Sequence, residues 1–564
     1  MATESAPLTS DQQLRTVCDR RISALEQDRL SWWYHWRELA WFIQPRLGRF
    51  LEMPNEANRG SQKNRRIIDS TGTTASQRFG AGMFAGTTNP ARPWFKLGVT
   101  GMEIANSSAV RLWLDEVAKR MLAILAASNF YRTMATLYEE LGVFGTACAL
   151  MYEDFEDVIR FYPKAAGEYY IAVDARLEAT TMAEKIVMTV EQIVGRFGLE
   201  QCSDNVKEMY RRGNLAQEFL IGHIVMPNDK RIVGAYGVDG MAYLDVAWEW
   251  GATSNKLLAK QGFNEKPFMA PRWNVTGNDP YGRSPGMDAL GDVKQLQLKN
   301  KRADQLVDKL VNPPMVAHVA LKNQPATSIP GGVTYLSGNE QSAFFKPAYE
   351  VNPQGMAAIN TSIEMIQRRV KTVFFEDLFL MIAQLDTVRT AAEIYERKEE
   401  KMLMLGPALE RIHDEGLRVT IYRLFGIMAR KGLLPKDIPE EIAGKKLSIE
   451  FISVLAQAQK AAATSTIERL WALAGNIAAV KPTILDNLDE DWTIREYGEM
   501  LGVPEKIFVD PRKVINLRAV KAQREQAAQQ GAAGVVAADA AKVLSDTPVG
   551  GGRSALQSML GVAA

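Results

Sequence analysis

Two long helical patterns near the middle of the chain, separated by a short insert, constrain the fold more than any other feature. In residues 288–311 the apolar side chains form one stripe, which the polar Asn300 interrupts. In residues 356–373 the apolar side chains recur at alternating spacings of three and four, which predicts an apolar seam on a second straight helix. The seam residues are Met356, Ile359, Ile363, Ile366, Val370 and Val373. At 1.5 Å per residue each helix would be roughly 30–40 Å long.

The insert between the two helices begins at Pro313 and Pro314, which stop the first helix at Asn312 because a residue before proline is pushed out of the α region. Residues 314–352 read as β-rich, with the turn signal Pro-Gly-Gly at 330–332. We therefore expect a hairpin-like stem that carries a small β tip. Lys294 and Lys301 fall on a different face of the first helix from its apolar stripe.

The N-terminal part of the chain reads as helical. Ser10 to Gln13 offers a capping box, and an apolar stripe then continues until Pro45. A helix of small residues follows at 69–86, and a helical pair lies between Val110 and Phe144. Between about 148 and 250 short runs of strand formers alternate with turn residues, with one interrupting helix near 190–212. The predicted class is mainly α with a smaller antiparallel β component.

The C-terminal half returns to helical patterns. Thr390 to Glu393 is a second capping box, and the helix that it opens runs to Gly432, with a kink or break expected at Pro407. Leu447, Ile449 and Phe451 alternate as in a strand. Further helices are predicted at 453–480, 491–501 and 511–530. The Ala- and Gly-rich residues from Gly531 are expected to be mobile, or weakly helical until assembly.

A connector of about 14 residues, 376–389, joins two helices and exceeds the usual length of such joins, which favours a functional loop. It is unusually apolar, because residues 378–382 are Leu, Phe, Leu, Met and Ile. In a single chain this run would have to be buried. Gln384 and Asp386 are its polar members.

The amino-acid composition argues against several classes of protein. A chain of 564 residues is too long for one core, so several sub-domains are expected. The 67 basic and 66 acidic residues nearly cancel, which argues against a general nucleic-acid coat but not against a local channel. Cys18, Cys148 and Cys202 are too dispersed for a disulfide framework or a zinc knuckle, which suits a reducing compartment. The four histidines are scattered singly, and neither a signal peptide nor a membrane span is visible.

Signals for an enzyme are weak. The glycine-rich run 80–86 lacks the lysine of a phosphate-binding loop and the spacing of a dinucleotide fingerprint, so close helix packing explains it better. Asp489, Glu490 and Asp491 immediately precede a helical pattern, where acids favour the N-terminus. Cys148 lies in an apolar run and reads as a core thiol. We therefore predict no catalytic residue, metal site or cofactor.

The aromatic cluster at 31–42 contains four tryptophans. Stacking of nucleic-acid bases on these rings is one interpretation. Trp33 and Trp36 lie on the apolar stripe, however, and basic residues are not interleaved regularly. Packing in the core or between subunits is therefore favoured.

Several strings in a fixed order give the chain a resemblance to the head-to-tail connecting (portal) proteins of short-tailed double-stranded DNA bacteriophages. The strings are WRELAWFIQP (Trp36 to Pro45), IIDST (Ile67 to Thr71), PWFKL (Pro93 to Leu97), PRW (Pro271 to Trp273), DPYGRSPG (Asp279 to Gly286), DVKQL (Asp292 to Leu296), NPPM (Asn312 to Met315), TAAEI (Thr390 to Ile394) with Glu399, LGP (Leu405 to Pro407), and LFGIMARKG (Leu424 to Gly432) with Pro435. Together they span roughly residues 30–435. No single string is decisive.

The resemblance implies a portal fold and a dodecameric ring around an axial channel for DNA. It assigns residues 1–285 to the wing, including the β lobe near 148–250; 286–312 and 354–375 to the stem helices; 313–353 to the clip; 376–389 to the channel loop; 390–432 to a kinked spine helix; 433–510 to a return through wing and crown; and 511–564 to the crown and a mobile tail. It further implies a place in the virion, at the head–tail junction of one capsid vertex, after assembly in the host cytoplasm and with no membrane.

Roles for particular residues follow from the same resemblance. The seam from Met356 to Val373 would pack in the stem and between subunits. Residues facing the channel would be Gln384, Asp386, Phe379, Lys294, Lys301, Arg368 and Lys371. The implied partners are double-stranded genomic DNA, the major capsid protein, the scaffolding protein, the terminase large subunit and tail adaptor or nozzle proteins. Two alternatives remain: another ring-forming virion protein such as a tail adaptor, and a phage DNA-processing enzyme.

Overall fold

The computed structural model describes residues 10–51, 64–99, 108–252, 256–316, 346–347, 354–383, 405–442, 445, 447–452, 467–478, 481, 483, 487–500, 509 and 511–547. The chain divides into two compact units. Unit 1 comprises residues 1–101 and 113–466, and unit 2 comprises residues 102–112 and 467–564. Helices predominate and the sheets are antiparallel, which confirms the predicted mainly α class with a smaller β component.

Helix α1 (Ser10–Phe42) is buried through residues of its apolar stripe such as Ile22, Leu25 and Trp36. Trp36 is fully buried, packs edge-on against Tyr281 at 5.0 Å and donates its ring N–H to the Phe144 carbonyl at 3.2 Å. This confirms core packing for Trp36. The helices that follow are α2 (Thr71–Thr87), α4 (Ser108–Ala127) and α5 (Phe130–Phe144).

The glycines of α2 lie where other helices approach closely. A Cβ on Gly80 would come within 3.1–3.2 Å of Glu139 in α5, and a Cβ on Gly82 would overlap the ring of Phe379. The glycine-rich run therefore serves helix packing, as predicted.

The β lobe contains a five-stranded sheet in the order β4-β5-β6-β7-β8 and a three-stranded sheet in the order β3-β2-β9. The strands are β2 (Cys148–Glu153), β3 (Ile159–Lys164), β4 (Tyr169–Val173), β5 (Ala179–Thr189), β6 (Glu218–Pro227), β7 (Tyr243–Glu249), β8 (Ala259–Phe263) and β9 (Phe268–Met269). Cys148 is fully buried in β2, as expected for a core thiol.

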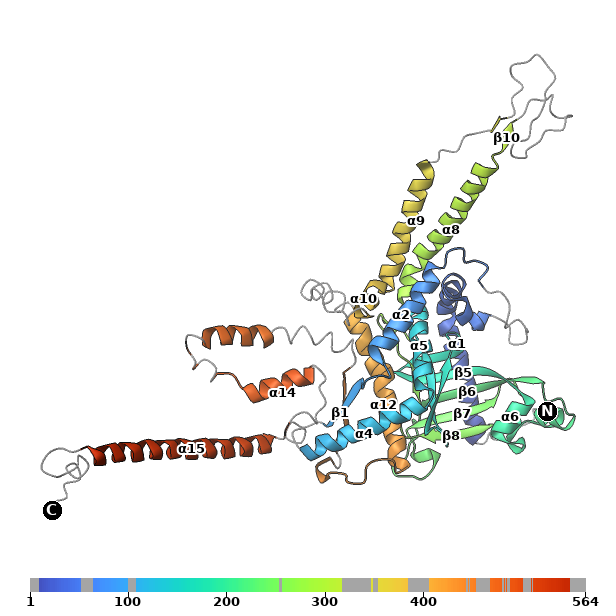
Figure 1. Cartoon of the computed structure of the whole chain (residues 1–564). Coiled ribbons are helices and arrows are strands. Elements are labelled where there is room, and N and C mark those ends of the chain that lie inside the picture. Colours follow the sequence, from blue (N-terminus) through green and yellow to red (C-terminus); the bar gives the residue numbers. More distant parts are fainter. Residues whose placement is uncertain are drawn as a thin grey trace, which may run out of the picture. The chain divides into compact units, whose positions relative to one another are not determined.

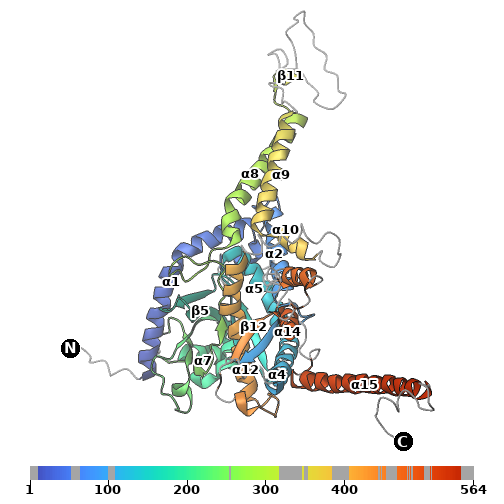
Figure 2. The same cartoon turned by 90° about the vertical axis from the view of Figure 1, so that its left-hand side faces the viewer.

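Both faces of the five-stranded sheet are covered, because successive side chains of a strand point to opposite faces. On one face Ile224 and Trp248 pack against Cys18 and Ile22 of α1 (Figure 2). On the other face Ile221, Ala247 and Leu258 pack against α6 (Val190–Phe197) and α7 (Asp204–Arg211). The interrupting helix predicted near 190–212 is thus a pair of short helices.

The rest of unit 1 contains a helical pair that extends away from the β lobe, a short helix and a longer one that returns (Figure 1). These elements are α8 (Pro285–Val311), β10 (Met315–Val316), β11 (Lys346–Pro347), α9 (Gln354–Val373), α10 (Glu376–Ala383) and α12 (Arg418–Arg430). Strand β1 (Phe95–Val99) pairs with β12 (Leu447–Phe451), which confirms the predicted strand. Short 3-10 segments lie at Pro45–Leu51, Leu199–Gln201, Val238–Gly240 and Glu440–Ile442.

Unit 2 contains a helix at 467–478, α14 (Glu490–Met500) and α15 (Pro511–Asp546). The Asp489 carboxylate accepts from the Trp492 backbone N–H at 2.9 Å, so the acidic run marks a helix start, as predicted. Asp491 pairs with Arg518 at 2.6 Å. The expected end of the last helix near residue 530 is wrong, because α15 continues through Gly531 to Asp546; the frequent alanines favour helix there.

Candidate ring-forming stem and its anchor

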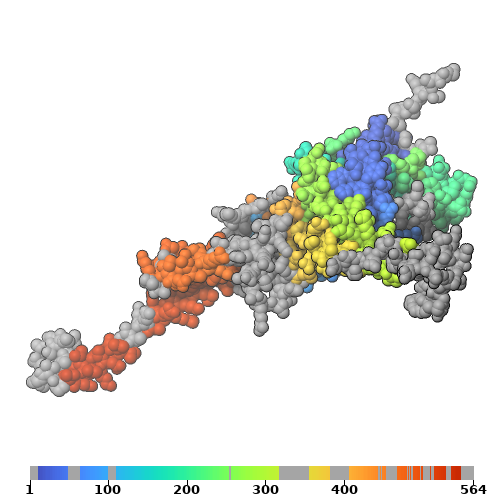
Figure 3. All heavy atoms as spheres, turned by 90° about the horizontal axis from the view of Figure 1, so that it is seen from above, coloured from blue at the N-terminus to red at the C-terminus, as the bar shows by residue number. Residues whose placement is uncertain are grey.

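The two stem helices lie side by side, as predicted, with the β10–β11 pair near their far ends (Figure 1). Helix α8 starts at Ser284, whose hydroxyl accepts from the Met287 backbone N–H at 3.0 Å, and it ends at Asn312 before the two prolines. Between β10 and β11 the expected clip lies outside the described residues. Figure 3 shows the surface of α9 (yellow) next to α8 (yellow-green), with α1 (blue) beside α8.

The seam of α9 is buried within the single chain over its second half. Ile363 is 8% exposed, Ile366 3% and Val370 fully buried. Met356, Ile359 and Val373 are half-buried. Three of the six seam residues are thus buried within the single chain, whereas packing of the whole seam against α8 and neighbouring subunits stays a prediction.

A polar clasp built around Asp69 joins the stem helices to the start of α2. One Asp69 carboxylate oxygen accepts from the Asn300 amide of α8 at 3.1 Å and from the Gln367 amide of α9 at 2.8 Å. Gln297 accepts from the backbone N–H groups of Ile68 and Asp69 at 2.7 and 2.8 Å and donates to the Asp69 carbonyl. The polar interruption at Asn300 is thus explained. The sequence analysis missed this clasp, although it lies in the IIDST string.

Residues 376–383 form helix α10, where a loop was expected. Leu378 is fully buried and Phe379 is 8% exposed, packed edge-on to Phe79 of α2 with ring centroids 5.8 Å apart. Glu376 pairs with Arg78 of α2. The predicted burial of the apolar run in a single chain is confirmed for Leu378 and Phe379, but it is wrong for Leu380, which is 48% exposed. The expectation that Phe379 faces DNA is wrong for this conformation, since α2 covers its ring.

The other channel candidates are dispersed. Lys294 forms an ion pair with Glu38 of α1 at 2.7 Å. Lys301 and Arg368 are exposed on α8 and α9, and Lys371 is half-buried. Gln384 and Asp386 lie outside the described residues.

The helix that follows the connector contains a π turn. Residues 405–411 and 418–430 are α-helical, but Ile412–Leu417 are wound as a π-helix, in which the Arg418 N–H bonds to the His413 carbonyl. Such turns insert one residue into a helix and frequently occur at functional sites. Pro407 lies five residues before this turn. Residues 390–404 are outside the described part, so a break at Pro407 stays a prediction.

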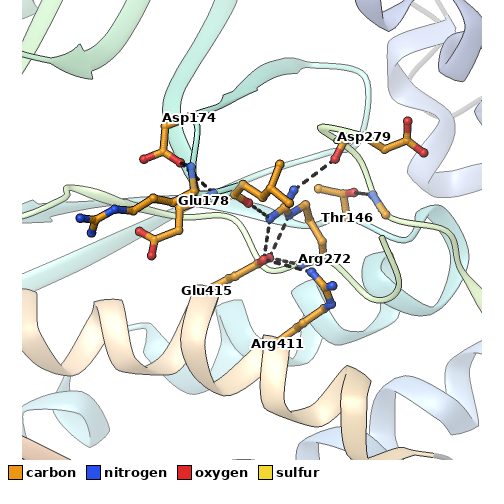
Figure 4. A network of polar contacts seen from close by, with 10 residues as sticks. Thr146, Asp174, Glu178, Arg272, Asp279, Arg411 and Glu415 are labelled. Carbon is orange, nitrogen blue, oxygen red and sulfur yellow. Dashed lines mark hydrogen bonds and ion pairs between the residues drawn. The ribbon is translucent and has the colours of Figure 1, made fainter. Parts of the chain in front are cut away.

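The π turn presents Glu415 to Arg272, which is 1% exposed (Figure 4). The Arg272 guanidinium donates to both Glu415 carboxylate oxygens at 2.6 and 3.0 Å, and the Arg272 backbone N–H donates to one of them at 3.0 Å. The same guanidinium donates to the carbonyls of Leu177 at 2.6 Å and Asp279 at 3.2 Å. Three stretches of unit 1, at Leu177, Asp279 and Glu415, therefore meet at one arginine.

Two glycines allow these segments to approach. Gly145 has a φ of +77°, and its carbonyl accepts from the Trp273 N–H at 2.8 Å. A Cβ on Gly145 would overlap the Gly282 carbonyl oxygen, and Thr146 accepts from the Gly282 N–H at 2.8 Å. The strings PRW and DPYGRSPG are thus both part of the anchor around Arg272. No local pattern indicated that Glu415 would complete it.

Among the described residues, His, Cys, Asp and Glu side chains form no group of three that could hold a metal ion. No described helix is both long and apolar enough to cross a membrane.

Comparisons with known proteins agree with this architecture. Residues 15–509 match the profile of the family described as bacteriophage head to tail connecting protein. The chain is 41% identical over 530 residues to the portal protein of Salmonella phage epsilon15, covering 94% of this chain and 95% of that protein. It is 39% identical over 524 residues to the probable portal protein of Bordetella phage BPP-1, covering 93% and 94% of the two chains.

Among solved structures, a chain from the virion of a native gene transfer agent particle aligns with a TM-score of 0.36 at 11% identity, covering 77% of this chain and 90% of that chain. A likeness this distant carries no argument. The match to the family profile extends over most of the chain, and the two phage relatives align over nearly their whole length. This chain belongs to the bacteriophage head to tail connecting protein family.

Proposed function

We propose that this chain is a portal subunit, which assembles into a dodecameric ring at one capsid vertex and provides the conduit for genome packaging and ejection. The observation that carries the proposal is 41% identity to a phage portal protein over 94% of the chain. The near-neutral net charge of +1 supports a conduit role, since a strongly basic bore would bind phosphates and hold the DNA.

In this proposal the protein acts by assembly rather than by catalysis. The α8–α9 hairpin is the stem, residues 313–353 are the clip, and Gln384 and Asp386 of the connector line the channel together with Lys301, Arg368 and Lys371. The clip receives the terminase large subunit and later the tail adaptor. The capsid and scaffolding proteins surround the ring, which is assembled in the host cytoplasm.

The experiment that tests this is mass measurement of the purified particle, followed by negative-stain imaging. We expect a closed ring, with twelve copies and a central bore. A ring without a bore would favour a tail adaptor or another virion component. A monomer that cleaves DNA would favour a processing enzyme.

If residues 313–353 are the clip, a change there should affect DNA packaging without affecting ring assembly. Replacing residues 321–340 by a short Gly/Ser link should leave ring formation intact, because the stem contacts remain, and should abolish terminase binding and DNA packaging. The measurements are sizing chromatography and packaged DNA per prohead. If the variant still packages DNA, the docking surface lies elsewhere.

The channel assignment predicts a charge effect at Gln384. The Gln384→Lys variant should build normal rings and proheads but yield few filled particles, because one lysine per subunit adds a ring of charge that forms charge-assisted contacts with phosphates. Packaged DNA length and plaque yield measure the effect, with assembly checked by microscopy. Normal values for both would remove residues 376–389 from the DNA path.

A further inference from the structure

A buried polar cluster lies where the two sheets of the β lobe meet. His223 of β6 is 3% exposed and stands between Glu184 of β5 and Asp245 of β7, which are 2% and 7% exposed. His223 Nδ1 is 2.9 Å from a Glu184 oxygen, and Nε2 is 2.8 Å from an Asp245 oxygen. Glu184 pairs directly with His223 in the strand register, so both side chains share a face of the sheet. That face is opposite to the one that α1 covers.

The second oxygen of each carboxylate is used by the three-stranded sheet. Tyr152 of β2 donates its hydroxyl to Asp245 at 3.0 Å, and its oxygen also lies 3.3 Å from His223 Nε2. Lys164 of β3 forms an ion pair with Glu184 at 2.7 Å. The carboxylates therefore bridge His223 on one sheet to Tyr152 and Lys164 on the other.

The hydrogen-bond geometry determines the protonation of this cluster. Ionised carboxylate oxygens only accept hydrogen bonds, so a ring nitrogen that faces one must carry a proton. Both nitrogens of His223 face such oxygens, which requires the imidazolium form. With Lys164, two positive and two negative charges then balance inside the lobe, which is the condition for burying them.

The electrostatic surroundings favour the same state. Burial by itself lowers the pKa of His223, but the charges and hydrogen bonds of Asp245 and Glu184 outweigh it and raise the pKa from 6.5 to about 9. Burial raises the pKa of Glu184, yet the opposing effects of His223 and Lys164 are larger together and lower it. The remaining titratable neighbours stay neutral: burial raises the pKa of both Tyr152 and Cys148. The positive charge of Arg196 in α6 lowers the pKa of Tyr152, but this effect is smaller than that of burial.

We propose that protonated His223 fastens the β2–β3–β9 sheet to the five-stranded sheet, so that the packing of the β lobe depends on pH. The contribution of His223 is complete below its unfolded pKa of 6.5 and is lost as the pH rises through its folded pKa of about 9. The contribution of Glu184, whose pKa is lowered, is complete above 4.5 and is lost as the pH falls below that value. The contact between the two sheets is therefore strongest between pH 4.5 and pH 6.5, where both contributions are complete.

Hydrogen–deuterium exchange of the assembled protein, measured from pH 6.5 to 9.5 and corrected for the intrinsic rate, tests the proposal with His223→Gln as the variant. Glutamine cannot become charged, so the variant should exchange faster than wild type in β2 and β3 at pH 6.5. As the pH rises from 6.5 through about 9, the wild-type protection should fall toward the value of the variant. A constant difference between wild type and variant across this range would overturn the proposal.

Tyr152→Phe keeps the proposal testable if His223→Gln does not fold. It removes only the hydroxyl that links β2 to Asp245 and leaves the imidazolium in place. We expect lower protection in β2 and β3 than in β6 and β7 at neutral pH, with the pH dependence retained. Equal protection of both sheets, or loss of the pH dependence, would contradict a fastening centred on His223.

Discussion

Replacing Ile363 by aspartate should prevent ring assembly. The side chain is 8% exposed in the seam between α9 and α8, where no water can solvate a carboxylate. An unpaired charge at such a site costs several kcal/mol, which the contacts between two single helices cannot offset. We expect soluble monomers or incomplete rings on a sizing column, with a lowered melting temperature.

Thr361→Asp is the matched control. It places the same residue two positions earlier on α9, where the side chain is exposed. This variant should keep the thermal stability of the wild type and form rings, because a solvated carboxylate on a helix surface costs little. Intact rings of normal stability from Ile363→Asp would refute the placement of this seam in the stem.

Arg272→Met should destabilise unit 1 more than any other exchange in the anchor. The substitution leaves the Glu415 carboxylate, 14% exposed, without its bidentate partner and leaves the carbonyls of Leu177 and Asp279 without a donor. Breaking a buried pair by removing one partner typically costs about 3–5 kcal/mol. Thermal or urea unfolding measures the loss.

Two further variants assign that loss to the buried pair. Arg411→Met removes a second arginine, 39% exposed and 3.7 Å from the same carboxylate, and should cost less than about 1 kcal/mol. Arg272→Met combined with Glu415→Met should recover part of the stability, because no unpaired charge is left buried. The recovery should be incomplete, because the two carbonyls remain without a donor. Equal losses for Arg272→Met and Arg411→Met would mean that the buried pair does not hold the π turn.

Local patterns were sufficient for the regular elements. The end of α8 at Asn312, the helix start at Asp489 and the strand at 447–451 all follow from caps, prolines and alternation in a few neighbouring residues. The seam of α9 followed from its spacing alone, because a straight amphipathic helix must bury that face.

Residues 376–383 show where local patterns fail. A long connector between two helices predicted a loop, but α2 offers an apolar surface with glycines, and packing Leu378 and Phe379 there stabilises a short helix. Propensity and connector length are weak terms, and burial of large apolar side chains outweighs them. The helix that continues beyond Gly531 to Asp546 has a different reason: the alanines there favour helix more than the glycines oppose it.

By itself, the sequence determined the class of fold, the pair of helices α8 and α9 and, through the order of its strings, the family. The tertiary structure alone decided which polar side chains meet. Asp69 meets Asn300 and Gln367, Arg272 meets Glu415, His223 meets Tyr152, and Lys164 meets Glu184, although these partners are separated by tens to hundreds of residues. Periodicity reports which face of an element is apolar, but the partner of a buried charge depends on how distant elements are packed, and no local spacing encodes that.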